Sequence, residues 1–108
     1  MSYGHAEWGP WVISDEAEAI EHIKTAYDLG VNTFDTSNSY SNGQSEILLG
    51  KAIKQHNLPR DEIVVLTKVW SNVGRTKTAT SFNPDELDKE RYVNQYGLSR
   101  KVSISNTQ

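Results

Sequence analysis

The chain has 108 residues, of which 36% are hydrophobic and 23% are charged, and its formal net charge is −3 at pH 7. This length fits at most one domain, and the composition is too apolar for a disordered chain. The negative net charge gives no electrostatic reason for binding nucleic acid or an anionic membrane, and we expect neither partner.

The residue types that build most metal sites are scarce or scattered. The chain contains no cysteine, which excludes a disulfide framework and a thiolate metal site. Its three histidines, His5, His22 and His56, lie far apart without ligand spacing, so we expect no metal. No apolar run approaches the roughly 18 residues that a membrane span needs, and no signal-peptide core follows Met1. We therefore expect a cytoplasmic protein.

The first thirty residues predict a loop followed by an amphipathic helix. Residues 1–13 contain two tryptophans, two glycines and a proline, which is typical of a loop. Trp8 and Trp11 could line an aromatic pocket or close the end of a core, and both interpretations stay open. Ser14-Asp15 is a good N-cap pair for a helix that ends at Gly30. Its apolar stripe, at three-and-four spacing, consists of Ala19, Ile20, Ile23, Ala26 and Tyr27.

Two short apolar segments are predicted to be strands separated by a second helix. Residues 31–35 (VNTFD) form the first, a short buried strand that ends in Asp35. Ser45 is predicted to cap the helix, which then runs over residues 46–57. Residues 63–68 (IVVLTK) begin with a continuous apolar run that is typical of a strand covered on both faces. This alternation with short connections predicts a parallel α/β sheet.

The periodic pattern stops after Trp70. Residues 71–96 are polar with little periodicity, which predicts an unusually long connection of the kind that forms functional lids or stays disordered. Ser99, in the segment GLSRK, is predicted to cap another helix. Residues 102–108 (VSISNTQ) have no helical stripe.

An acid, a phenol and an amine fall at the carboxyl ends of the two predicted strands. Asp35 ends the first strand, Tyr40 lies in the following loop, and Lys68 ends the second strand. In parallel sheets these ends meet at one edge, where functional side chains gather. A nearby ammonium stabilises a phenolate, which makes the phenol a stronger general acid. We infer Tyr40 as the acid, Lys68 as its tuning group and Asp35 as the carboxylate that orients Lys68.

The residues alone also allow a structural interpretation of the same cluster. In that interpretation Asp35 caps the loop, Tyr40 packs on it, and Lys68 is a solvated strand end. A family resemblance favours the functional interpretation. The segment DTSNSYSNGQSEILLGKAI (residues 35–53) resembles the aldo-keto reductase signature, with a D-T-x-x-x-Y turn and G-x-S-E-x-x-L-G. VVLTKV (residues 64–69) resembles the strand of that family that ends in T-K.

The likeness covers residues 15–68 and returns at GLSRK, which, with the long insertion before it, resembles the fungal aryl-alcohol dehydrogenase branch. The resemblance implies a (β/α)₈ TIM barrel that binds NADP without a glycine-rich dinucleotide loop. It also implies reduction of an aldehyde or ketone by hydride transfer, with a tyrosine protonating the oxygen. By motif, Tyr40 matches the proton donor and Lys68 its tuning partner. Asp35 matches the aspartate beside the lysine and the nicotinamide, which makes it a cofactor-binding residue as well.

The implied substrate is a small-molecule carbonyl compound or alcohol, and no protein partner is defined. The family's fourth catalytic residue, a histidine at the end of the next strand, has no counterpart in this sequence. A barrel takes about 250 residues, so we expect only its first two to three βα units. Residues 1–70 would be the partial barrel segment and residues 71–108 a long loop and truncated tail, in a fragment that is inactive alone. The alternatives are a non-catalytic remnant and a small interaction module that adds its edge strand to another chain.

Overall fold

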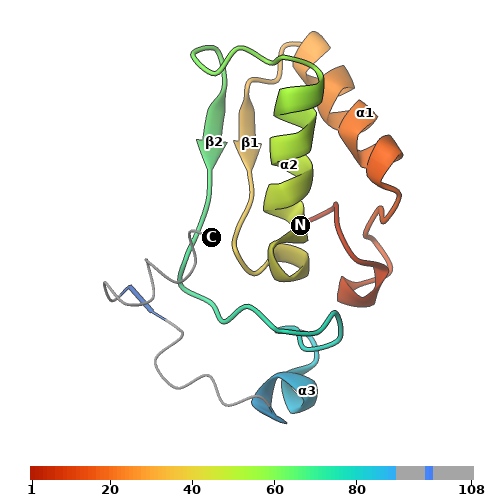
Figure 1. Cartoon of the computed structure of the whole chain (residues 1–108), viewed down its shortest axis with the longest axis vertical. Helices are drawn as coiled ribbons and strands as arrows, with labels where there is room; N and C mark the ends of the chain where they lie inside the picture. The colour runs from red at the N-terminus through yellow and green to blue at the C-terminus, as the bar shows by residue number, and fades with distance from the viewer. Residues whose placement is uncertain (90–96, 99–108) are drawn as a thin grey trace.

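The computed structural model describes residues 1–89 and 97–98, which form a small α/β unit with a parallel pair of strands (Figure 1). The order of helix, strand, helix and strand agrees with the prediction from the sequence. No helix among the described residues is long and apolar enough to cross a membrane. The main elements are α1 (Glu16–Asp28), β1 (Thr33–Asp35), α2 (Gln44–Gln55) and β2 (Val64–Leu66). The shorter helices are η1 (Ala6–Trp8), η2 (Tyr40–Gly43) and α3 (Pro84–Lys89).

Helix α1 begins and ends where the sequence predicts. The Asp15 carboxylate accepts a hydrogen bond of 2.9 Å from the Glu18 backbone N–H, which caps one of the free donors of the first turn. Gly30 follows the helix with φ of 95°, a left-handed conformation that costs glycine little. The stripe residues Ala19, Ile20 and Ile23 are buried.

The two strands are shorter and more exposed than predicted. They pair in parallel, with Thr33 opposite Val64 and Asp35 opposite Leu66. Both helices pack on the face that carries the middle residue of each strand. Val64 and Leu66 point the other way and are 47% and 48% exposed, so the prediction of a doubly covered second strand is wrong. Thr33 and Asp35 are also exposed, so the prediction of a buried first strand is wrong. The reason is that no described element lies on this second face.

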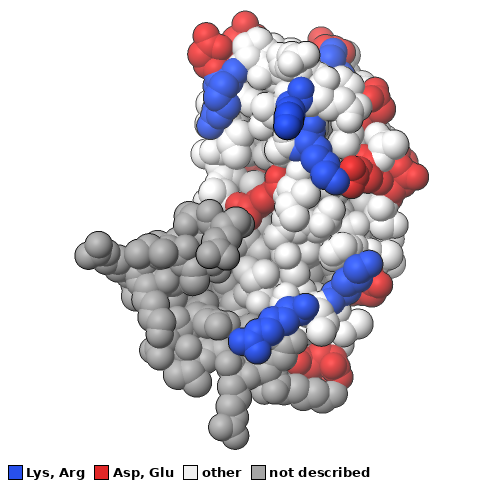
Figure 2. All heavy atoms as spheres, viewed as in Figure 1, with Lys and Arg blue, Asp and Glu red and all other residues white. Residues whose placement is uncertain are grey.

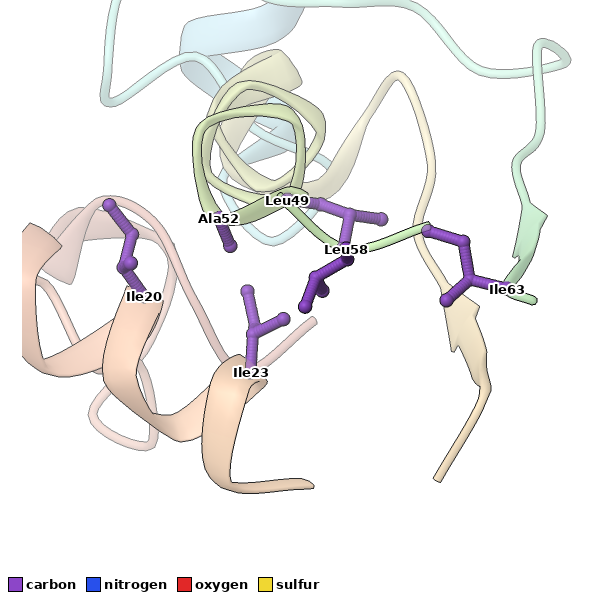
Figure 3. Close-up of a cluster of buried hydrophobic side chains, with 6 residues drawn as sticks. All are labelled: Ile20, Ile23, Leu49, Ala52, Leu58 and Ile63. Carbon is purple, nitrogen blue, oxygen red and sulfur yellow. The ribbon is translucent and has the colours of Figure 1, made fainter. Parts of the chain in front are cut away.

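The hydrophobic core lies between α1, α2 and the covered face of the sheet. Figure 3 shows its side chains converging from both helices and from the segment that enters β2. Full burial of one such aliphatic side chain contributes about 1.5–3 kcal/mol relative to exposure, so this cluster is the main source of stability for the unit. Its members are Ile20, Ile23, Leu49, Ala52, Leu58 and Ile63.

Helix α2 starts earlier than predicted, and Ser45 is not its N-cap. The helix begins at Gln44, after Gly43 at φ of 89°, and no side chain caps it. Ser45 lies inside the first turn, where its hydroxyl accepts a hydrogen bond of 2.8 Å from Thr36 Oγ1. Two residues with positive φ, Ser41 and Asn42, precede the glycine and turn the chain into the helix before Ser45 is reached.

The connection after Trp70 contains a helix that the sequence analysis missed. Helix α3 starts at Pro84 and carries Asp85 and Glu86 in its first turn, which is a good helix start within a polar stretch. The Asn83 carbonyl accepts the backbone N–H of both Glu86 and Leu87, at 3.2 and 3.1 Å. The helix predicted to start at Ser99 lies outside the described residues.

Charged side chains of both signs are spread over the surface. On the face shown in Figure 2, basic and acidic groups lie near one another instead of gathering into a patch of one sign. Lys51 pairs with Glu16 at 2.7 Å and so joins α2 to α1. Exposed pairs of this kind typically contribute less than about 1 kcal/mol each, so packing rather than charge holds the helices together.

Candidate active site

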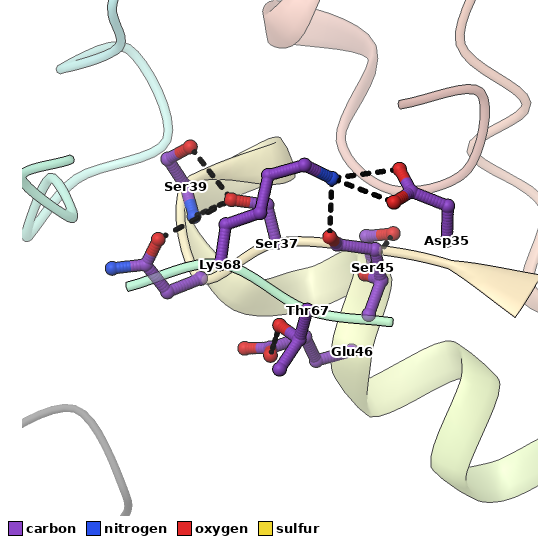
Figure 4. A network of polar contacts seen from close by, with 9 residues as sticks. Asp35, Ser37, Ser39, Ser45, Glu46, Thr67 and Lys68 are labelled. Carbon is purple, nitrogen blue, oxygen red and sulfur yellow. Dashed lines mark hydrogen bonds and ion pairs between the residues drawn. The ribbon is translucent and has the colours of Figure 1, made fainter. Parts of the chain in front are cut away.

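The carboxyl ends of β1 and β2 bring Asp35 and Lys68 into direct contact (Figure 4). Lys68 Nζ donates hydrogen bonds to Asp35 Oδ1 at 2.8 Å, to Asp35 Oδ2 at 2.7 Å and to the Thr36 carbonyl at 2.9 Å. The register explains this contact. Asp35 is opposite Leu66, and Lys68 follows two residues later, on the same face by the strand period of two.

Tyr40 joins the pair from the loop after β1. The Lys68 ammonium lies over the Tyr40 ring, with Nζ 4.9 Å from the ring centroid, within the range of a cation–π contact. Tyr40 begins η2 and is partly buried. The structure therefore brings together all three residues that the sequence singled out.

The electrostatics of the site keep Lys68 charged. Its pKa is raised, first by the hydrogen bond to Asp35; desolvation opposes the rise, and the hydrogen-bond and charge contributions of Tyr40 add to it. The side chains of Lys68 and Asp35 are 48% and 53% exposed, so the pair orients the ammonium and adds little stability.

Backbone hydrogen bonds hold the two loops together beyond the strands. The Thr36 N–H donates to the Leu66 carbonyl at 2.8 Å, and the Asn38 N–H donates to the Lys68 carbonyl at 3.1 Å. The Asn38 side chain also donates to the Ser71 carbonyl at 2.9 Å. This polar turn is buried, because each of its residues is at most 9% exposed: Thr36, Ser37, Asn38 and Ser39. The turn is therefore a rigid base for Tyr40 and Lys68.

Aromatic side chains lie beside Tyr40. Trp8 is 3% exposed, and its ring is tilted against the Tyr40 ring at a centroid distance of 6.4 Å. Phe82 packs edge-on against Trp8 at 4.9 Å and against Trp11 at 5.6 Å. We call Trp8, Trp11 and Phe82 the aromatic cluster. Trp8 is buried, as expected if it closes the end of a core. Trp11 and Phe82 are exposed.

Two buried polar atoms near Tyr40 have no hydrogen-bond partner among the described residues. They are Trp8 Nε1 and the hydroxyl of Ser41, which directly follows Tyr40. A buried unsatisfied group costs about 1–3 kcal/mol, so a water molecule or a ligand that bonds either atom would recover this cost.

Sequence analysis missed Asn42. Its Oδ1 accepts the Gly74 N–H at 3.0 Å, and its Nδ2 donates to the carbonyls of Thr76 and Ala79 at 2.8 and 3.0 Å. The available signal was the Asn42-Gly43 dipeptide, a frequent turn pair that places asparagine at positive φ.

Within residues 1–89 and 97–98, histidines and carboxylates form no metal site. The described residues contain no group of three or more His, Asp and Glu side chains that could hold a metal ion. His22 and His56 face Glu18 and Glu21 of α1, at 3.9 and 3.2 Å.

Known proteins resemble this chain over most of its length. The profile of the aldo/keto reductase family matches residues 1–102. The chain belongs to the aldo/keto reductase family. It is 43% identical over 107 residues to an aldo-keto reductase of Alternaria alternata, which covers 93% of this chain and 29% of that protein.

Two further relatives are also fungal proteins. A protein of Schizosaccharomyces pombe that carries the name aryl-alcohol dehydrogenase is 44% identical over 107 residues, covering 94% of this chain and 30% of that protein. The versiconal hemiacetal acetate reductase of Aspergillus parasiticus is 39% identical over 102 residues, covering 94% of this chain and 29% of that protein. The resemblance to the fungal aryl-alcohol dehydrogenase branch is thus confirmed, and the chain spans about a third or less of these relatives.

Proposed function

We propose that this chain carries the proton-transfer part of an NADP-dependent oxidoreductase that reduces aldehydes and ketones, aryl aldehydes among them, to alcohols. The observation that supports this most is the Lys68 ammonium, which contacts the Asp35 carboxylate and the Tyr40 ring together. A cation placed beside a phenol stabilises the phenolate that remains after the proton has left.

Each of the three residues has one task in the proposed reaction. The Tyr40 hydroxyl protonates the carbonyl oxygen of the substrate and later regains a proton from solvent. Lys68 stabilises the Tyr40 phenolate, and Asp35 holds Lys68 charged and in place. A nicotinamide cofactor held beside Asp35 would supply the hydride for the carbonyl carbon. Proton transfer by a positioned side chain typically contributes about 10²–10⁴-fold to the rate.

Asp35 is also the proposed cofactor-binding residue. Its carboxylate is 53% exposed although Lys68 bonds both oxygens, so each oxygen keeps free acceptor capacity. The carboxamide of a nicotinamide ring is an N–H donor that matches such an acceptor.

The proposal extends to the architecture. Residues 1–70 are the proposed start of a TIM barrel, and residues 71–108 follow it. The parallel pair with its helices on one face is the repeating unit of such a barrel. We propose that the site binds a small carbonyl compound or alcohol. We also propose that the protein is located in the cytoplasm.

The test measures NADPH oxidation with 4-methoxybenzaldehyde in two proteins. The first is the 108-residue chain. The second is a chimera in which residues 1–102 replace the matching stretch of the Alternaria reductase. We expect an active chimera that loses about 10²–10⁴-fold of its rate on Tyr40→Phe. Tyr27→Phe is the matched control, since Tyr27 bonds Glu62 and not the site. An active Tyr40→Phe chimera would refute the proposal.

The uncovered sheet face supports a second candidate, an interaction module. Val64 and Leu66 expose apolar surface, and β1 and β2 form a sheet of only two strands among the described residues. Such edges can pair with another chain. A chain that neither binds nor oxidises NADPH, and that melts cooperatively only with a partner at fixed stoichiometry, would favour this candidate.

A further inference from the structure

The side chain of Asn42 makes three hydrogen bonds to one loop. Its carbonyl oxygen accepts the Gly74 N–H, and its amide donates to the carbonyls of Thr76 and Ala79. An asparagine amide has two N–H donors, and both carbonyls accept from this group. All three partners are backbone groups more than 30 positions away, so one side chain joins the turn after β1 to the connection after β2.

The backbone at Asn42 is shaped for this contact. Its φ of 51° and ψ of 47° lie in the left-handed region, where asparagine is tolerated better than most other residues. Gly74 fits closely against the same loop, because a Cβ there would lie 1.8 Å from the Ala79 carbonyl oxygen and 2.8 Å from Asn42 Nδ2. A larger residue at position 74 would therefore push Asn42 and residue 79 apart.

The loop held by Asn42 leads directly to the aromatic cluster. Ala79 and Thr80 are buried, at 1% and 2% exposure, and they precede Phe82. Phe82 is exposed, but its ring lies edge-on against Trp8, which itself contacts Tyr40. The position of Phe82 thus depends on a loop that Asn42 fixes.

We propose that Asn42 is a positioning residue that sets the place of Phe82 and hence the aromatic surface beside Tyr40. Asn42 acts through the loop of residues 74–80 and touches neither substrate nor cofactor. The surface it arranges takes an aromatic ring, which stacks or packs edge-on against such side chains. This inference rests on the proposed function, because the ring belongs to the carbonyl substrate whose oxygen Tyr40 protonates.

The first arm of the test uses the full chain and no substrate. Asn42→Gly keeps the left-handed backbone and removes all three bonds. We expect hydrogen exchange at the Gly74 amide, measured by NMR, to become faster by about tenfold or more, since loss of a net hydrogen bond is worth on the order of one decade. The matched control is Asn57→Gly. Asn57 also has positive φ (50°), is exposed and has no side-chain bond to this loop. An unchanged Gly74 amide in Asn42→Gly overturns the inference.

The second arm measures binding of 4-methoxybenzaldehyde to the full chain by the NMR shift of the Trp8 indole N–H. We expect Asn42→Gly to weaken aldehyde binding by roughly tenfold and to leave the melting midpoint of the α1–α2 core unchanged. A merely structural role would lower the melting midpoint together with the affinity. Equal affinity of the two proteins overturns the positioning role. The Gly74 amide of Asn42→Gly could exchange faster while the unsubstituted chain binds no aldehyde. This result would overturn the proposal that Asn42 arranges a surface for the substrate ring. The proposed function fails separately, when the Tyr40→Phe chimera stays active.

Discussion

Lys68 Nζ contacts both carboxylate oxygens of Asp35, at 2.8 and 2.7 Å, although the two residues are 33 positions apart in the chain. The parallel register of β1 and β2 produces this contact, because it places the ends of both strands at one edge. The same ammonium lies over the Tyr40 ring, so one cation interacts with both the Asp35 carboxylate and the Tyr40 phenol.

Asp35→Asn should lower the pKa of Lys68 toward 10.5, because the hydrogen bond to Asp35 is the largest cause of its rise. The raised pKa stabilises the folded chain at all pH values below 10.5, the ordinary pKa of a lysine. This stabilisation is lost as the pH rises through the higher pKa of the folded state. NMR titration of the Lys68 side chain measures the change.

Glu16→Gln is the matched control for this titration, because it removes the carboxylate partner of Lys51 and leaves the site intact. The Lys68 titration should then stay at its original midpoint. The same midpoint in Asp35→Asn would contradict the assignment of Asp35 as the group that holds Lys68 charged.

Leu49→Ala should destabilise the chain by about 2–5 kcal/mol, because it removes a buried side chain from the core and leaves a cavity. Urea unfolding followed by circular dichroism measures the free energy of unfolding. Leu29→Ala is the control, since Leu29 is 81% exposed, and its effect should stay within about 0.5 kcal/mol. A comparable loss in both variants would mean that the α1–α2 core is not the stabilising centre.

His5 should titrate below its ordinary pKa of 6.5, first because of burial and second because of the nearby Lys77 charge. Its neutral form is favoured in the fold, so its contribution to stability is complete above pH 6.5. It is lost as the pH falls through the lower pKa of the folded state. The NMR titration midpoint of His5 measures this shift, and Lys77→Met should raise that midpoint. A midpoint at or above 6.5 would contradict the packing of His5 in this structure.

Leu66→Gln should reduce self-association of the purified chain, because it removes apolar surface from the uncovered sheet face. Analytical ultracentrifugation over a range of concentrations measures the effect. Ile47→Gln is the matched control, since Ile47 is similarly exposed but lies on α2. Equal effects of the two substitutions would show that general hydrophobicity, and not the sheet face, drives association.

Local sequence signals predicted most of the elements. Asp15, the stripe before Gly30 and the apolar run before Lys68 each depend on interactions within a few residues, and all three were identified. The start of α2 differs from the prediction because Ser41 as well as Asn42 adopts positive φ, and the Asn42-Gly43 turn pair gives no signal for Ser41. Helix α3 was missed because its short start at Pro84 lies in a polar stretch without an apolar stripe.

The order of the elements, the family and the three residues of the candidate site follow from the sequence alone, because motif spacing and helical periodicity are local properties of the chain. The folded chain adds two features that local patterns do not predict: among the described residues nothing covers one face of the sheet, and Asn42 joins two distant loops. In the same fold Phe82 packs between Trp8 and Trp11. These contacts join residues more than 30 positions apart, and they depend on how helices and loops pack, which no single segment encodes.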